Sequence, residues 1–568
     1  MPQTDCTQAH VAGEQWDRAR IADALAQFRS AQSTMAASQR DFAESSGIPR
    51  TTLQHWLGRR ESLLLDEEQG AFFESPAGAA FLLRLVVSAH FAMTWTGTCG
   101  IRLVGQFLRL CGLEKYVACS YGTHQKLSSR IAEALVTFGK EERSRLGATM
   151  VPRDVTVCED ETFLSEGICL VAIEPVSGFI LAERYAEKRD AETWNQELGR
   201  ATDGLPVTVV QSTADEAKAL AAHARDIGAH HSPDLFHVQN EVNRATVLPL
   251  LRRSEGALKV HESTKAAVQR GVEARDAYQV GPRGPGRPPN FEARIQEAQV
   301  RLDDAAAALS TAQQHRLDSL AAVRAIADDY HPFDLSSGAK RTPEQLDECL
   351  RKHLGVVRTV ATEAALSIRS NKGIEKAARV APKMVATLRF FHDRVEQQLQ
   401  ALGLSEPLEQ AMRAAVIPAA YLLRAAGRTD QIERRDQLRA LAGRLVAPHQ
   451  HPDSPIGALA AGDRECLEAA AFELADLFQR ASSCVEGRNG RLSQWEHAQR
   501  KLTPKKLDGL TVVQNYFAQR QDKTTAAERF FGTRPRDIFM WLLDQMPAPS
   551  RPKRARTRPA KTMLLQPA

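Results

Sequence analysis

The spacing of apolar residues changes twice along the chain, and these changes limit the folds that it can adopt. The spacing is helical up to about residue 150, and from Val155 it becomes that of short strands. After His237 it is helical again for roughly 240 residues, which is much too long for a loop. The sequence therefore predicts a small sheet set between two helical regions.

The middle region has a definite order of elements. We expect three strands, a helix, a strand, a second helix and a short last strand. This is the order of a ribonuclease H-like α/β sheet. The expected strands are 155–158, 168–173, 179–185, 207–211 and a piece that ends at His237, and the expected helices are 192–201 and 216–227. Further helices are expected at 464–500 and 525–545.

The length of 568 residues indicates several domains, because single hydrophobic cores stop growing near roughly 250–300 residues. We expect a mixed, mostly α fold, in which a ribonuclease H-like α/β domain is interrupted by a long all-helical insertion and preceded by an N-terminal helix-turn-helix. The expected boundaries are a helix-turn-helix region at 1–75, a helical connecting region at 76–150, the first part of the core at 151–245, the insertion at 246–463, the helices that complete the core at 464–546 and a basic tail at 547–568.

The helix-turn-helix rests on the segment 39–57. Ala43 is small enough for two helices to cross closely, Gly47 can take the positive φ of a tight turn, and Leu53 and Trp56 face inward from the next helix. In a DNA-binding unit with this spacing, the outward residues of the second helix reach base edges and phosphates; here they are Arg50, Thr51, Gln54, His55 and Arg59. A helical hairpin that serves packing or protein contact has the same spacing.

Composition narrows the class of protein. No stretch is apolar enough to span a membrane, and the N-terminus lacks a signal pattern, so we expect a cytoplasmic protein. The nine cysteines include no Cys-x-x-Cys pair, and Cys111, Cys158 and Cys169 lie in apolar runs. This pattern indicates buried reduced thiols rather than disulfides or a zinc site.

Two aspartates lie where strands of the expected sheet end. Asp160 closes the first strand and Asp215 follows the fourth. In a ribonuclease H-like sheet these strands are neighbours, so both carboxylates would project from one edge. Cutting a phosphodiester is assisted by two hard cations about 3.5–4 Å apart, and such cations prefer carboxylate oxygens. An aspartate at a strand end also commonly caps the following turn or helix, which explains either residue taken alone.

With these residues, the chain resembles the DDE transposases of bacterial insertion sequences. The matching segments are the strand that leads into Asp160-Glu161-Thr162, the strand that leads into Asp215, and Pro233-Asp234-Leu235-Phe236-His237. The last contains the Asp-x-x-His signature of several such superfamilies, hAT-like ones included, and similar enzymes place a large helical insertion after it. The resemblance covers residues 150–245 and 480–545 approximately.

The resemblance implies a third acid on the first helix after the insertion. Glu486-Gly487-Arg488-Asn489 is similar to the Glu-Gly-x-Asn form of that motif, and we assign Glu486. Glu528 is the alternative, because Ala526-Ala527-Glu528-Arg529 resembles the Ala-Glu-Arg helix start of other insertion-sequence families. Thr525 and Glu528 also have the spacing of a capping box, which by itself explains Glu528.

The family's chemistry would then be cleavage at transposon ends, followed by joining of the 3′-hydroxyl to target DNA. The resemblance implies two Mg²⁺ or Mn²⁺ ions held by Asp160, Asp215 and Glu486. Asp234 and His237 would support this site without binding metal outright. Arg488 and Asn489 would contact a phosphate or the flanking DNA strand, although a solvated helix face explains these two equally well.

The insertion and the tail indicate further partners. Residues Ile295, Leu302 and Leu309 lie seven apart, each with an alanine three residues later, and predict a coiled-coil-like hairpin that would suit a dimer contact. The tail holds six basic residues and no acid, so the rest of the chain has a net charge of 5 − 6 = −1. The tail therefore favours salt-sensitive binding to DNA. We therefore expect double-stranded DNA as partner (terminal inverted repeats and target), a homodimer or larger oligomer, no membrane, and a place at the bacterial nucleoid.

Two other functions fit the same residues. A non-catalytic DNA-binding regulator derived from a transposase would keep the fold without the reaction. A metal-dependent DNA nuclease would use the same acids to cut DNA without joining it.

Overall fold

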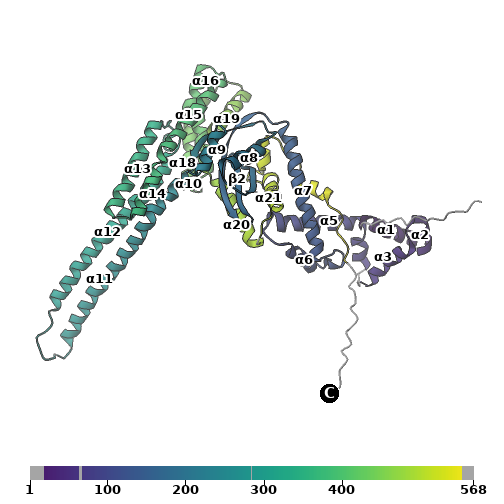
Figure 1. The fold of residues 1–568 in the computed structure, drawn as a ribbon, viewed down its shortest axis with the longest axis horizontal. Helices are drawn as coiled ribbons and strands as arrows, with labels where there is room; N and C mark the ends of the chain where they lie inside the picture. Colours follow the sequence, from purple (N-terminus) through teal and green to yellow (C-terminus); the bar gives the residue numbers. More distant parts are fainter. Residues whose placement is uncertain (1–17, 63–66, 283, 500, 553–568) are drawn as a thin grey trace, which may run out of the picture.

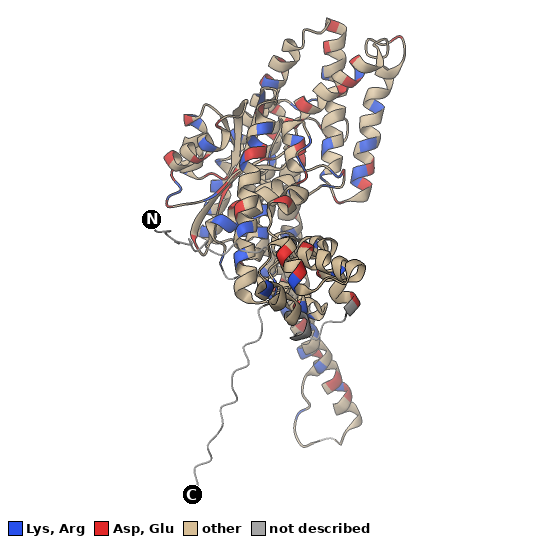
Figure 2. Ribbon diagram, turned by 90° about the vertical axis from the view of Figure 1, so that its right-hand side faces the viewer, with Lys and Arg blue, Asp and Glu red and all other residues tan. Residues whose placement is uncertain are grey.

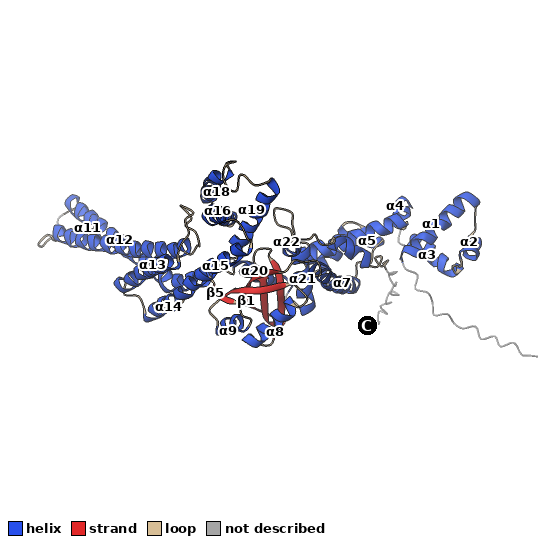
Figure 3. Ribbon diagram, turned by 90° about the horizontal axis from the view of Figure 1, so that it is seen from above, coloured by secondary structure: helices blue, strands red, loops and turns tan. Residues whose placement is uncertain are grey.

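The computed structural model describes residues 18–62, 67–282, 284–499 and 501–552. The protein is mostly helical, with one five-stranded sheet in the middle of an elongated molecule (Figures 1 and 3). The expected basic tail lies outside these residues from Lys553 onward, and so does the side chain of Arg59.

The sheet has the strand order β3-β2-β1-β4-β5. Antiparallel pairing joins β1 to β2 and β2 to β3, whereas β4 is parallel to both β1 and β5. Along the chain, α8 separates β3 from β4 and α9 separates β4 from β5, which is the order of elements expected from the sequence. The bounds are β1 Arg153–Leu164, β2 Gly167–Glu174, β3 Phe179–Ala186, α8 Ala191–Thr202, β4 Val207–Ala214, α9 Lys218–Asp226 and β5 His230–Pro233.

Strand β1 is longer than expected. It continues to Leu164, because its pairing with β2 extends to the tight turn before Gly167. Its pairing with β4 ends earlier, at Cys158 opposite Thr213. Asp160 therefore lies inside the strand and not at its end, two residues beyond the last pair with β4.

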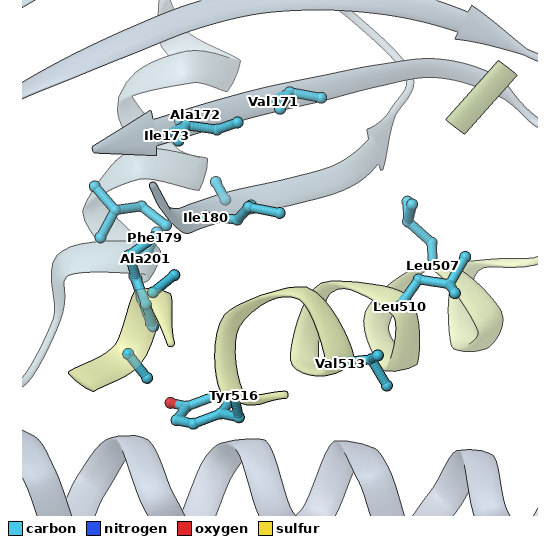
Figure 4. Close-up of a cluster of buried hydrophobic side chains, with 14 of the residues drawn as sticks. Val171, Ala172, Ile173, Phe179, Ile180, Ala201, Leu507, Leu510, Val513 and Tyr516 are labelled. Atoms are coloured by element: carbon cyan, nitrogen blue, oxygen red, sulfur yellow. The ribbon is translucent and has the colours of Figure 1, made fainter. Parts of the chain in front are cut away.

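One face of β2 and β3 packs on a helix from the far end of the chain, α21 (Pro504–Tyr516). Figure 4 shows residues of both strands, among them Ile173 and Ile180, on one side of a core with Leu507, Leu510 and Val513 on the other. The Asn515 side chain accepts from the backbone N–H of Ile180 at 2.9 Å and donates to its carbonyl at 3.0 Å. It thus provides hydrogen-bond partners for the outer side of the edge strand β3.

The helices after β5 form a second core of their own and extend away from the sheet (Figure 1). The longest two, α11 and α12, form a hairpin in which Ala305 and Ala312 are buried, and Ile295, Leu302 and Leu309 are partly buried, as the seven-residue spacing predicts. The bounds are α10 Leu235–Val242, η3 Asn243–Val247, α11 Leu248–Val280, α12 Phe291–Asp329, α13 Pro343–Glu363, α14 Ile368–Ala378, α15 Ala381–Ala401, α16 Glu406–Ala411, η4 Met412–Val416, α17 Ile417–Gly427, α18 Ile432–Val446, η5 Ala447–Gln450 and α19 Ala461–Asp476.

On the other side of the sheet, the N-terminal helices form two small hydrophobic clusters of their own. Helices α2 and α3 are joined by a turn in which Gly47 has a φ of 69°, and Leu53 and Trp56 are buried. Acidic and basic residues are interspersed along the helices (Figure 2). The bounds are α1 Arg18–Met35, α2 Gln39–Ser46, α3 Arg50–Ser62, α4 Glu67–Phe73, α5 Pro76–Phe91, η1 Ala92–Thr96, α6 Ile101–Leu110, η2 Leu113–Lys115 and α7 Tyr121–Gly147.

Several sequence-based expectations were too simple. The expected helix 464–500 is two helices, α19 and α20 (Ser483–Gln499), and 525–545 is also two, α22 (Ala526–Phe531) and α23 (Ile538–Gln545), because Gly532 ends α22 with a φ of 67°. Among the described residues, one helical stretch, Pro76–Thr96, is long and apolar enough to cross a membrane, and half of it is buried in the protein. The described cysteines are free, but Cys111 is exposed, unlike Cys158 and Cys169.

Candidate functional site

Three carboxylates come together where β1 and β4 part. Asp160 is on β1, Asp215 directly follows β4, and Glu486 is in the first turn of α20. The pKa of Asp160 is raised to about 6, mainly because the group is largely buried and further because Glu486 and Asp215 are negatively charged neighbours. Residues from three distant parts of the chain thus share one electrostatic site.

Helix α20 is held against the sheet by a buried ion pair. Arg488 donates two hydrogen bonds to Glu183 of β3, at 2.7 and 2.6 Å, and both side chains are almost inaccessible to water. Thr511 of α21 donates a third bond to the same carboxylate at 2.6 Å. The expectation that Arg488 contacts DNA is therefore wrong, because its guanidinium is occupied inside the protein.

Asn489, the next residue, contacts the acidic site. Its Nδ2 donates to Oδ2 of Asp160 at 2.9 Å, which places Asn489 against Asp160. Its Oδ1 is buried and has no hydrogen-bond partner within the described chain. A carbonyl oxygen left unsatisfied beside a carboxylate is costly unless a donor or a cation approaches it.

Asp234 and His237 lie at the same edge of the sheet. Asp234 caps α10 by accepting from the backbone N–H of Phe236 at 2.8 Å, and it also accepts from Ser482 Oγ at 2.6 Å. Nε2 of His237 lies 4.0 Å from Oε1 of Glu486, and its charge when protonated lowers the pKa of Asp160. Asp234 thus ties the start of α10 to the residue before α20, while His237 faces the acids.

A buried network on the opposite face of β1 was missed in the sequence analysis. Glu159 is fully buried, accepts from Ser212 Oγ at 2.5 Å, and lies 3.0 Å from Nε2 of His223, whose other ring nitrogen contacts Asn195. The alternation of side chains along a strand places Glu159 and Asp160 on opposite faces, and this was the available signal. The network links β1, β4, α8 and α9 directly beneath the acidic site.

Glu528 lies elsewhere. It is in the first turn of α22, which packs against β3 and α21, and its backbone N–H donates to Thr525 Oγ1 at 3.1 Å. The reciprocal bond of a full capping box is not formed, but the threonine cap explains the helix start. The strand order puts β3 at the edge of the sheet, two strands away from β1.

The residue types at this site suit a hard divalent cation. Three carboxylates and the unsatisfied carbonyl oxygen of Asn489 are oxygen ligands, which Mg²⁺ and Mn²⁺ prefer. As the side chains stand, no three His, Cys, Asp or Glu residues of the described chain are close enough to hold one ion. The carboxylates repel one another, so cations would have to draw them together.

The residues expected to read DNA are far from the acids in the fold. Arg50, Thr51, Gln54 and His55 are exposed along or beside one side of α3, in the N-terminal helical unit at the opposite end of the molecule from the insertion (Figure 1). The structure does not bring them to the acidic site.

Comparison with known proteins adds one match. A family described as a family of unknown function (DUF6399) matches residues 412–558. This segment includes Glu486 and Asn489 but neither Asp160 nor Asp215. No curated protein matches the chain.

Replacing Arg488 by Met should destabilise the protein by roughly 3–5 kcal/mol, because Glu183 would remain buried without its counter-charge. Chemical denaturation followed by tryptophan fluorescence measures the change. Arg491→Met, on an exposed position of the same helix, is the control and should change stability much less. Adding Glu183→Gln to the Arg488 variant should restore part of the loss; equal losses for both arginine variants would contradict the role of the pair.

The raised pKa of Asp160 predicts a pH dependence of stability without divalent ions. The carboxyl has its ordinary pKa of 3.8 in the unfolded chain and a pKa of about 6 in the folded protein. Stability from this group is therefore present below pH 4 and is lost as pH rises to about 6. In a chelator, Asp160→Asn should match the wild type at pH 4 and melt at a higher temperature at pH 7. Equal melting temperatures at pH 7 would show that the pKa of Asp160 is not raised in the folded protein.

Proposed function

We propose that the protein is a DNA transposase of the DDE type, which cuts at transposon ends and joins the freed 3′-hydroxyl to target DNA. The observation that carries the proposal is the convergence of Asp160, Asp215 and Glu486, seen in the effect of the latter two on the pKa of Asp160. The strand order β3-β2-β1-β4-β5, which is that of a ribonuclease H-like sheet, supports it, as does the helical insertion between β5 and α20.

Asp160, Asp215 and Glu486 would hold two Mg²⁺ or Mn²⁺ ions, which when bound help to activate the attacking oxygen and to neutralise the leaving oxygen. In the first step, water attacks the phosphorus at the transposon end and the 3′-oxygen leaves. In the second, that 3′-hydroxyl attacks a target phosphodiester, whose own 3′-oxygen leaves. Asn489 fixes Asp160 through its hydrogen bond, and Arg488 fixes the helix that carries Glu486.

In this proposal the α2–turn–α3 unit is a helix-turn-helix that reads the terminal inverted repeats. Its support is the positive φ at Gly47, the burial of Leu53 and Trp56, and the exposure of Arg50, Thr51 and Gln54. The basic tail would add sequence-independent affinity, and the α11–α12 hairpin would contact a second copy, since joining two ends requires at least a dimer.

Single substitutions Asp160→Asn, Asp215→Asn and Glu486→Gln should each reduce DNA cleavage by roughly a thousandfold or more, because each removes an anionic ligand worth several kcal/mol in the transition state. The assay uses DNA with the inverted repeats that flank the gene, Mg²⁺, and a separate target. Binding to the same DNA without Mg²⁺ should persist, and Glu528→Gln should leave cleavage unchanged.

The same assay separates the alternative functions. A regulator would bind the repeats and cut nothing, and a nuclease would cut but give no joined product. Full activity in the Asp160→Asn variant would refute the acidic site itself.

Gln54→Ala should weaken binding to the repeats by about 1–3 kcal/mol if Gln54 contacts a base. Binding to unrelated DNA of equal length should hardly change, since that binding depends on phosphate contacts. Fluorescence anisotropy at fixed salt concentration measures both. Gln32→Ala, an exposed glutamine on α1, is the matched control. An equal loss on both DNAs would mean that Gln54 contacts the DNA backbone and not a base. No loss on either DNA would exclude α3 as the helix that recognises the repeats.

A further inference from the structure

A pocket in the insertion, away from the acidic site, is lined by three arginines. It has a volume of about 390 Å³ and lies between the end of α12, the end of α17 and the start of α18. Its polar lining includes Arg428, Arg434, Arg480, His331 and Tyr421. We call it the arginine pocket.

Arg480 is the group that makes this pocket unusual. Its guanidinium is largely buried and donates to the backbone carbonyls of Ala327 and Tyr330, at 2.6 and 3.3 Å, where α12 ends. Burial lowers the pKa of Arg480, and the nearby Arg428 lowers it further. Both bonds come from Nη1, and neutral carbonyls do not neutralise the charge. A buried charge that is only partly compensated is unfavourable.

The acids that line the pocket compensate its positive charge only in part, because three arginines face two aspartates, Asp328 and Asp430. Asp328 is engaged by Arg434, whose Nη2 donates to it at 2.6 Å, and Asp430 is exposed at the rim. Burial and the arginines 480, 434, 341 and 428 together hold the pKa of His331 well below its usual range. The arginines of the lining therefore outnumber its acids, and His331, which contacts Tyr421 Oη at 2.6 Å, adds no positive charge at physiological pH.

The start of α18 adds donors to the same pocket. Gln431 and Arg434, at the first turn of this fifteen-residue helix, line the pocket, and Gln431 makes no side-chain cap to the free backbone N–H groups. Uncapped N–H groups at a helix start favour anions, and arginines favour phosphate oxygens in particular. From these features we propose that the arginine pocket binds a phosphate group.

The pocket is separate from the acidic site but close to it in the fold. The carbonyl of Arg480 accepts from the backbone N–H of Leu235, which follows Asp234, at 2.9 Å. The phosphate is either that of a small molecule or one of the DNA backbone; both present the same oxygens to Arg428 and Arg480. The inference does not depend on the acids being catalytic.

The test uses the full-length protein, without divalent ions, titrated with inorganic phosphate at constant ionic strength set with NaCl. Phosphate should raise the melting temperature, and calorimetry should show Arg428→Ala binding it about tenfold more weakly, as expected for losing one charge-assisted hydrogen bond. Arg428 is exposed, so this variant should fold normally. Arg444→Ala, an exposed arginine at the far end of α18, is the matched control and should bind like the wild type.

A second measurement distinguishes the sources of the phosphate. Duplex DNA of random sequence is titrated into the same variants, again without divalent ions. If Arg428→Ala weakens both phosphate and DNA, the backbone of DNA occupies the pocket; if it weakens phosphate alone, a small phosphate compound does. No stabilisation by phosphate beyond that of NaCl, or equal phosphate affinities of the Arg428 and Arg444 variants, would overturn the proposal.

Discussion

The buried ion pair between Arg488 and Glu183 is the contact on which the acidic site depends. It joins α20 to β3 across 305 residues of sequence, and a buried pair of this kind tolerates little displacement because either charge alone would be strongly unfavourable. The flanking residues of Arg488 are Asn489, which bonds Asp160, and Gly487, which follows Glu486. One internal contact therefore sets the position of two groups at the site.

The site itself works against folding. Asp160, Asp215 and Glu486 are half-buried and repel one another, and the unsatisfied oxygen of Asn489 adds to the cost. Two features of the surrounding structure offset this cost: the apolar contact of β2 and β3 with α21, and the hydrogen-bonded network of Glu159 under β1. Bound cations would remove this repulsion, and unfavourable arrangements of like charges are common at functional sites.

Local patterns predicted much of this architecture, and long-range contacts did not follow from them. The strand spacing predicted the order of elements, and Gly47 predicted the turn before α3, because both depend on neighbouring residues. The contacts of Arg488 and Asn489 with the sheet did not follow from the sequence, since which face of α20 meets the sheet is decided by partners in β1 and β3 some 300 residues away. Glu159 was missed because its partner His223 lies on α9, beyond any sequence pattern.

The insertion can vary without changing the positions of the three acids, because hydrogen bonds join its two ends at the sheet. Ser482, just before α20, bonds Asp234, just before α10, and Gln211 of β4 bonds the carbonyl of Gln479 at 2.9 Å. Once these ends are joined, the entropy of closing the long segment between them has been lost already and depends only weakly on its length. The helices between the two ends can then hold further features, such as the arginine pocket. These features do not alter the arrangement of Asp160, Asp215 and Glu486.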